Sequence, residues 1–111
     1  MRAANEEASI QVWNEVIERY PEMRQWVAHN KTVPLPILEV LSMSSDKDVR
    51  YAVAMKRKLS PLIFDRLARD PDESVRAAIA ANRKAPIDLL SLLAHDQSPM
   101  VSSIARSRIS P

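Results

Sequence analysis

The sequence predicts an all-α fold, a right-handed superhelix in which two-helix repeats of about 26 residues stack on one another. First, residues of one kind recur when the chain is shifted by about 26 positions, as at Val49 and Val75 and at Leu41, Leu67 and Leu93. Second, the chain contains no glycine, which disfavours the positive φ angles and tight hairpins of β-rich folds. Third, eight prolines supply the breaks between helices.

Residues 1–20 are interpreted as an N-terminal capping helix, the second helix of an incomplete leading repeat. Five apolar residues in it are spaced three and four positions apart and should share one face. These residues are Val12, Trp13, Val16, Ile17 and Tyr20. Pro21 is expected to end this helix and to start the next one, since a missing N–H is tolerated in the first turn.

Residues 21–46, 47–72 and 73–98 are interpreted as three repeats of a single domain, each made of a first helix, a short turn and a second helix. The first helices are expected at Pro21–Asn30, Lys47–Lys58 and Pro71–Asn82, and the second helices at Pro34–Ser42, Ser60–Arg69 and Pro86–His95. Asp70 is followed three residues later by Glu73, which is a capping-box pattern. This pattern predicts the start of the first helix of the third repeat, Pro71–Asn82.

Each predicted helix has an apolar stripe that it can bury only against a neighbour, so the repeats should form one continuous core. In the first helices the stripes are Met23, Trp26 and Val27; Val49, Ala52 and Val53; and Val75, Ala78 and Ile79. In the second helices they are Ile37, Leu38 and Leu41; Ile63, Phe64 and Leu67; and Leu89, Leu90 and Leu93.

Residues 99–111 are interpreted as a partial C-terminal repeat that consists of one more first helix. If one residue is lost from the turn before it, Met100 and Ile104 take the places of Val75 and Ile79. The chain reaches Pro111 where a second helix should begin, which would leave the last complete repeat only half covered. We therefore expect this end to dock on a second copy or on a partner protein.

One segment resembles a known repeat family. Residues 70–82 read Asp-Pro-Asp-x-x-Val-Arg-x-Ala-Ile-Ala-x-Asn, and residues 86–96 read Pro-x-x-Leu-Leu-x-x-Leu-Ala-x-Asp. This pattern is similar to the leucine-rich repeat variant, which belongs with the α-superhelices of the HEAT and armadillo type. The resemblance covers about residues 21–111. It implies the superhelical fold but no single function, because such repeats host many unrelated roles.

The chain departs from the family pattern at two positions and lacks one of its features. Lys56 stands where Asn30 and Asn82 stand in the neighbouring repeats, and Ser44 stands where Asp70 stands. Members of the family can have an N-terminal iron–sulfur module with cysteine ligands. This chain contains no cysteine, so that module is not expected here.

Composition narrows the classes of function. The absence of cysteine excludes disulfides, thiolate metal sites and cysteine nucleophiles. His29 and His95 are isolated from ligand-spaced carboxylates, and no serine has the neighbours of a nucleophile. We therefore expect no enzyme activity, no metal and no cofactor. No apolar run is long enough to span a membrane or to act as a signal peptide, so a cytoplasmic location is expected.

Arginine recurs at one position of the repeat, at Arg24, Arg50 and Arg76. These side chains could bind acidic groups or phosphates of a ligand. They could instead pair with aspartates such as Asp70 or Asp72, in their own or the adjacent repeat, and this structural interpretation is favoured.

A second basic series follows the first helices and should form a ridge along one edge of the stack. Its members are Lys31, Lys56, Arg57, Lys58, Arg83, Lys84, Arg106 and Arg108. Such a ridge could follow a nucleic-acid backbone or contact another partner. Helix dipoles alone also place bases at C-termini and acids at N-termini, and we favour this second explanation.

We predict a non-catalytic scaffold that binds a protein or a peptide; nucleic-acid binding through the basic edge is the alternative. Exposed residues of the second helices are candidate contacts, namely Glu39, Asp65, Arg66 and Ser91. Trp13 and Trp26 could anchor a partner, but packing inside the fold is the favoured role for both.

Overall fold

The computed structural model describes the backbone of residues 2–109 and the side chains of residues 10–109. The described chain is all-helical and contains no strand, which confirms the predicted fold class at that level. Its elements are α1 (Arg2–Arg19), the 3₁₀ helix η1 (Pro21–Met23), α2 (Arg24–His29), α3 (Leu35–Leu41), α4 (Lys47–Ala54), α5 (Pro61–Ala68), α6 (Glu73–Ala81), α7 (Ile87–Leu93) and α8 (Pro99–Ile109). None of these helices is both long enough and apolar enough to cross a membrane.

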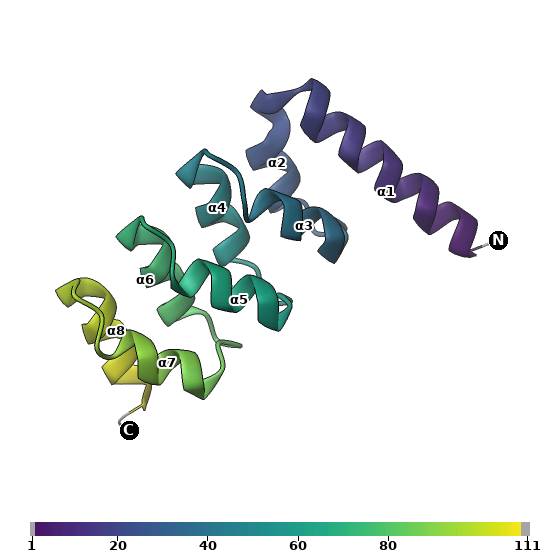
Figure 1. Cartoon of the computed structure of the whole chain (residues 1–111). Coiled ribbons are helices and arrows are strands. Elements are labelled where there is room, and N and C mark those ends of the chain that lie inside the picture. The colour runs from purple at the N-terminus through teal and green to yellow at the C-terminus, as the bar shows by residue number, and fades with distance from the viewer. Residues whose placement is uncertain (1, 110–111) are drawn as a thin grey trace.

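The helices after α1 form two rows (Figure 1). In one row α4 packs on α2, α6 packs on α4, and α8 packs on α6. The other row contains α3, α5 and α7, and α1 lies beside α2 and α3 at the N-terminal end. The resulting body is elongated, with extents of 47 × 28 × 17 Å.

Side-chain caps determine where several helices begin. Asp46 accepts a hydrogen bond from the Asp48 N–H at the start of α4, and Asp72 accepts hydrogen bonds from two N–H groups at the start of α6. The prediction that α6 starts at Pro71, with Asp70 as its cap, is therefore wrong by two residues. The carboxylate of Asp70 instead accepts a hydrogen bond from the Asp72 N–H and forms an ion pair with Arg50. It is therefore not available to cap the helix.

The core confirms most of the predicted stripes. The residues at 26-residue spacing in the first helices, Val27, Val53 and Ile79, are all fully buried. In the second helices Leu41, Leu67 and Leu93 are at most 1% exposed. The stripes differ from the prediction at the N-terminal end, where four apolar residues are exposed: Val12, Tyr20, Met23 and Trp26. Val12 lies on α1, Tyr20 between α1 and η1, Met23 in η1 and Trp26 on α2.

The register of α8 also differs from the prediction. Val101 and Ala105 are fully buried, whereas Met100 is 44% exposed. The 26-residue spacing from Val75 therefore continues to Val101, and no residue is lost from the preceding turn. Ser98 explains this continuity, because it lies 26 positions after Asp72 and its hydroxyl accepts a hydrogen bond from the Val101 N–H at 3.5 Å.

Candidate binding surfaces

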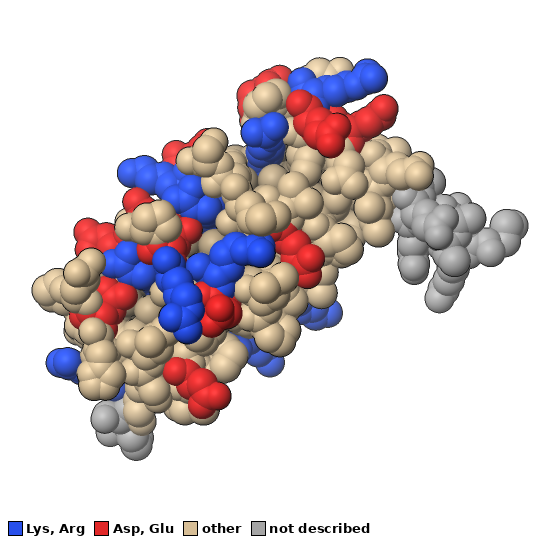
Figure 2. Space-filling model, in the orientation of Figure 1, with Lys and Arg blue, Asp and Glu red and all other residues tan. Residues whose placement is uncertain are grey.

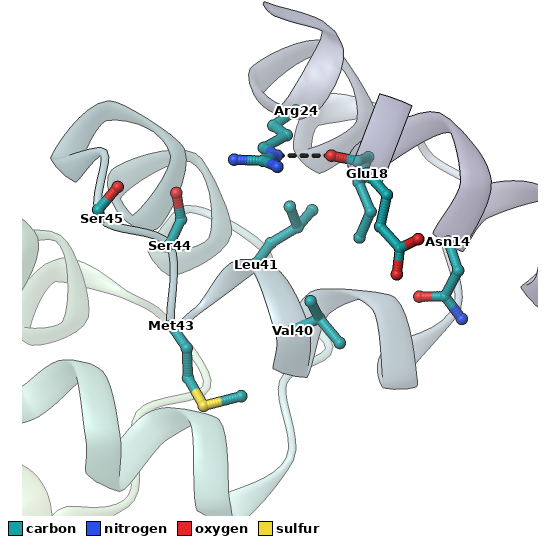
Figure 3. A pocket seen from close by; sticks show the side chains of 9 residues that line it. Asn14, Glu18, Arg24, Val40, Leu41, Met43, Ser44 and Ser45 are labelled. Atoms are coloured by element: carbon teal, nitrogen blue, oxygen red, sulfur yellow. Dashed lines mark hydrogen bonds between the residues drawn. The ribbon is translucent and has the colours of Figure 1, made fainter. Parts of the chain in front are cut away.

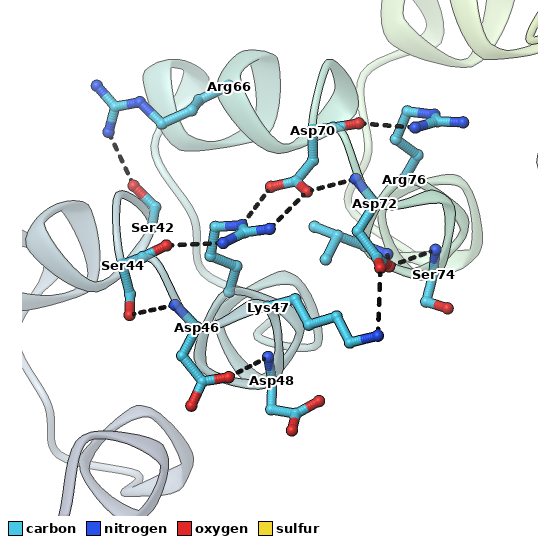
Figure 4. Close-up of polar contacts among 12 residues, drawn as sticks. Ser42, Ser44, Asp46, Lys47, Asp48, Arg66, Asp70, Asp72, Ser74 and Arg76 are labelled. Carbon is cyan, nitrogen blue, oxygen red and sulfur yellow. Dashed lines mark hydrogen bonds and ion pairs between the residues drawn. The ribbon is translucent and has the colours of Figure 1, made fainter. Parts of the chain in front are cut away.

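Two arginines of the 26-residue series bind aspartates in the turn after the next helix (Figure 4). Arg50 donates from Nε and Nη2 to the two carboxylate oxygens of Asp70, at 2.7 and 3.1 Å. Arg76 makes the same pair of bonds to Asp96, at 2.9 and 3.2 Å. In both cases Nη1 donates to a backbone carbonyl six residues earlier. Each of these two arginines thus joins the turn before its own helix to the turn after the next helix.

These ion pairs lie where water is largely excluded. The side chains of Arg50 and Asp70 are only 13% and 4% exposed. Burial raises the pKa of Asp96, but hydrogen bonds from Arg76 and from the Ser98 N–H, together with the charge of Arg76, outweigh it and hold this pKa below its ordinary value. The hydrogen bond to Asp70 similarly raises the pKa of Arg50. These two shifts favour the charged forms of Asp96 and Arg50.

A second series of contacts, which the sequence reasoning missed, runs along the opposite edge. Lys56 donates from Nζ to the Asn30 carbonyl at 2.7 Å, and Asn82 donates from Nδ2 to the Lys56 carbonyl at 2.7 Å. Arg108 continues the series by donating to the Asn82 carbonyl at 2.9 Å. Burial lowers the pKa of Lys56. The sequence did show that polar residues recur here at 26-residue spacing. It did not show that their side chains donate hydrogen bonds to backbone carbonyls far away in the sequence.

Several predicted contact residues are consequently engaged within the fold. Besides Lys56 and Arg108, Arg106 donates to the Ala94 carbonyl at 3.1 Å. Arg66, which was expected to face a partner, donates to the Ser42 hydroxyl at 2.8 Å.

The remaining bases of the predicted ridge are exposed and make no side-chain hydrogen bond or ion pair within the part of the chain that the structure describes. They are Lys31, Arg57, Lys58, Arg83 and Lys84. Lys31, Arg57 and Lys58 lie around one groove of about 320 Å³ beside α3, together with Lys56 and three apolar residues. Arg57 also lines a smaller groove with Arg83. The structure therefore gathers part of the ridge, on the edge away from the paired aspartates.

Charge is mixed on the face that Figure 2 displays, where Lys and Arg side chains lie among Asp and Glu side chains. The ion pairs at the surface include Arg69 with Asp65, both largely exposed, and Lys47 with the less exposed Asp72. Among the described residues no group of three or more His, Cys, Asp or Glu side chains could hold a metal ion.

A further groove of about 440 Å³ lies between α1, α2 and the turn after α3 (Figure 3). Its polar lining includes Arg24 and Ser44, and its walls are largely apolar. Arg24 donates from Nε to the Ile17 carbonyl at 2.6 Å. It makes no ion pair within the described residues, unlike its counterparts Arg50 and Arg76.

The two ends of the α2–α4–α6–α8 row expose different kinds of side chain. Met23, the last residue of η1, and Trp26 of α2 are 37% and 55% exposed. The residues 26 and 52 positions later are buried, namely Val49, Ala52, Val75 and Ala78. At the other end, α8 exposes Ser103, Arg106 and Ser107. The row thus presents two large apolar side chains at its η1–α2 end, whereas α8 exposes these three polar side chains besides Met100.

Comparisons of this chain with protein-family models, with curated proteins and with solved structures found no match. The resemblance to the leucine-rich repeat variant therefore stays a prediction.

Proposed function

We propose that this chain is a short right-handed α-solenoid of three two-helix repeats, and that it is a non-catalytic scaffold that binds another polypeptide. The observation that supports this proposal is the exposure of Met23 and Trp26 at positions that are buried in α4 and α6. Large exposed aromatic and sulfur-containing side chains are enriched where proteins bind one another.

The burial pattern indicates which side of α2 these residues face. Ala28, Ala54 and Ala80 are buried in helices that are followed by another helix of the row, and the equivalent Arg106 of α8 is exposed. A position that is exposed only in α8 therefore lies on the side where the other helices of the row contact the helix that follows them. A position that is exposed only in α2 lies on the side where the others contact the helix that precedes them. Since the preceding helix covers this face in α4 and α6, we propose that an amphipathic helix of a partner covers it in α2.

The C-terminal end of the row, at α8, gives less support for binding to a second copy of the chain. A homodimer through the C-terminal end stays a prediction. Arg106 of α8, at the position that is buried in α2, α4 and α6, is exposed and polar, as in the capping repeats of stacked arrays. We therefore place the proposed partner at α2.

Photo-crosslinking tests the partner surface. The crosslinking amino acid benzoylphenylalanine replaces Trp26 in one variant and Ser103, exposed at the polar end, in the control. We expect discrete polypeptide adducts from position 26 and none from position 103. Trp26→Glu should abolish association with the crosslinked polypeptide while the melting temperature stays close to wild type, since the side chain is largely exposed. Absence of adducts at position 26, or equal adducts at both positions, contradicts the proposal.

Nucleic-acid binding is a second candidate, which the gathering of unpaired bases favours. Lys31, Arg57 and Lys58 surround one groove, and no acidic residue lines it. A cluster of this kind can neutralise successive phosphates, and the binding it gives weakens steeply as salt rises.

Titration of labelled duplex DNA and RNA at several salt concentrations tests this candidate. Arg57→Gln/Lys58→Gln should reduce the slope of log K against log salt by about 2. The control Lys47→Gln/Arg69→Gln removes two positive charges from the opposite edge and should leave that slope unchanged. Salt-insensitive binding, or equal effects of the two double variants, argues against a specific nucleic-acid edge.

A further inference from the structure

Arg24 occupies the repeat position of Arg50 and Arg76, but among the side chains that the structure describes no carboxylate forms an ion pair with it. The aspartates that bind those two arginines lie 20 residues further along the chain. The residue 20 positions after Arg24 is Ser44. A hydroxyl group is shorter than a carboxylate and carries no charge, so it cannot form the bidentate ion pair.

Ser44 preserves only one of the two tasks that aspartate performs at this position. Asp70 accepts a hydrogen bond from the Asp72 N–H at 2.9 Å while it binds Arg50. Ser44 accepts the corresponding bond from the Asp46 N–H at 3.1 Å. The turn is therefore maintained, and only the ion pair is lost.

The guanidinium of Arg24 adopts a different arrangement from its two counterparts. Its Nε donates to the Ile17 carbonyl, whereas the Nε of Arg50 and of Arg76 binds a carboxylate. Within the described residues, Nη1 and Nη2 of Arg24 make no hydrogen bond. Glu18 also lines the groove, but Figure 3 shows its carboxylate directed away from Arg24 and toward Asn14.

The walls of the groove are suited to an apolar group beside this cation. Ile17 and Leu41 form its buried part, and Val40 and Met43 are 45% and 62% exposed. A flexible methionine adapts well to ligands of varied shape. The groove thus combines two free guanidinium nitrogens with an accessible apolar surface.

We propose that Arg24 binds the side-chain carboxylate of an acidic residue in a partner polypeptide, with an apolar side chain of the same segment packed against Val40 and Met43. This inference rests on the proposed polypeptide-binding function and specifies the chemistry of the partner. The internal repeats indicate the occupant, because Arg50 and Arg76 each bind an aspartate that follows a helix with a buried apolar face.

A hexapeptide copied from residues 93–98, blocked at both ends, serves as the probe because it contains Asp96 in its native sequence context. Its binding is followed by NMR through the Nε–Hε signal of Arg24. We expect a saturable shift with a dissociation constant on the order of 1 mM, as for a ligand held by a single bidentate pair. The same peptide with Asn at the position of Asp96 should bind at least tenfold more weakly.

Two substitutions should abolish peptide binding for different reasons. Ser44→Asp supplies the carboxylate from within the chain, and it should raise the melting temperature by about 4 °C while it blocks the site. Arg24→Lys keeps the charge but removes the bidentate donor, so peptide binding should be abolished, and in this variant it is followed through the backbone amide signals of Met43 and Ser44 in the groove. The reverse change, Asp96→Ser, should leave Arg76 unpaired and create a second peptide site there, with a loss of stability.

Other outcomes overturn the proposal. It is wrong if Ser44→Asp binds the peptide as wild type does, or if the Asn peptide binds equally well. Inorganic phosphate that shifts the Arg24 signal when the acidic peptide does not would indicate a phosphate ligand instead. The peptide result is independent of crosslinking at position 26. Adducts without peptide binding refute only the role of Arg24, and peptide binding without adducts refutes only the partner surface on α2.

Discussion

Replacement of Asp70 tests how much the arginine series stabilises the fold. Its carboxylate accepts two hydrogen bonds from Arg50 and one from the Asp72 N–H, and its side chain is 4% exposed. Asp70→Ala removes all three bonds and leaves a largely buried guanidinium with only the Ser44 carbonyl as acceptor. Breaking a buried pair in this way costs about 4 kcal/mol. At about 4 °C per kcal/mol for a domain of this size, the melting temperature should fall by about 16 °C.

Asp70→Asn separates the charge from the turn. Asparagine can still accept the Asp72 N–H, so this variant should lose only about 2 kcal/mol, the part due to charge-assisted bonds. Thermal unfolding followed by circular dichroism at pH 7 measures both variants, and a cycle with Arg50→Gln gives the coupling energy. The control is Lys47→Ala, whose exposed pair with Asp72 at 3.8 Å should contribute less than about 0.5 kcal/mol. If Asp70→Ala costs no more than this control, the series does not stabilise the fold and the reasoning is refuted.

Three other predictions concern single positions. Lys56→Asn should stabilise the protein by about 1 kcal/mol in urea unfolding, because asparagine can repeat the contacts of Asn82 without burying a charge; a loss of stability contradicts this. The pKa of Asp96 in the folded chain is below the ordinary value of 3.8, so its contribution to stability should be complete above about pH 4 and be lost as the pH falls through the folded pKa. Stability measured from pH 2 to 7 should show this loss, and Asp96→Asn should reduce it. Leu67→Ala should cost about 3 kcal/mol, because the side chain is fully buried in the core, and a cost below about 1 kcal/mol would show that the site collapses around the smaller residue.

The two polar series explain why short helices can form a cooperative body. The mean helix here is too short to be stable alone, and most of its stability has to come from neighbours. Arg50 and Arg76 join successive turns on one edge, and Lys56 and Asn82 do so on the other. Contacts at fixed sequence separation therefore add a directional component to an otherwise apolar interface.

The sequence predicted the core of the middle of the chain well. Ile63, Phe64 and Leu67 were expected to be buried and are buried, because helical spacing alone determines which side chains share a face. The same rule failed for Met23 and Trp26. Helical spacing shows that they share a face, but it does not show whether another helix covers that face.

The candidate binding residues also show which features depend on sequence and which depend on tertiary structure. The sequence by itself determined the all-helical fold, the 26-residue period and the positions at which charged residues recur. Only the tertiary structure decided which of these charges are engaged: Lys56 and Arg108 reach carbonyls 26 residues earlier in the chain, whereas Arg57 and Lys58 do not. A long side chain finds its acceptor in space, so its partner depends on how neighbouring turns are stacked and not on the local pattern. For the same reason the two guanidinium nitrogens of Arg24 that make no hydrogen bond within the described residues became evident only by comparison with Arg50 and Arg76.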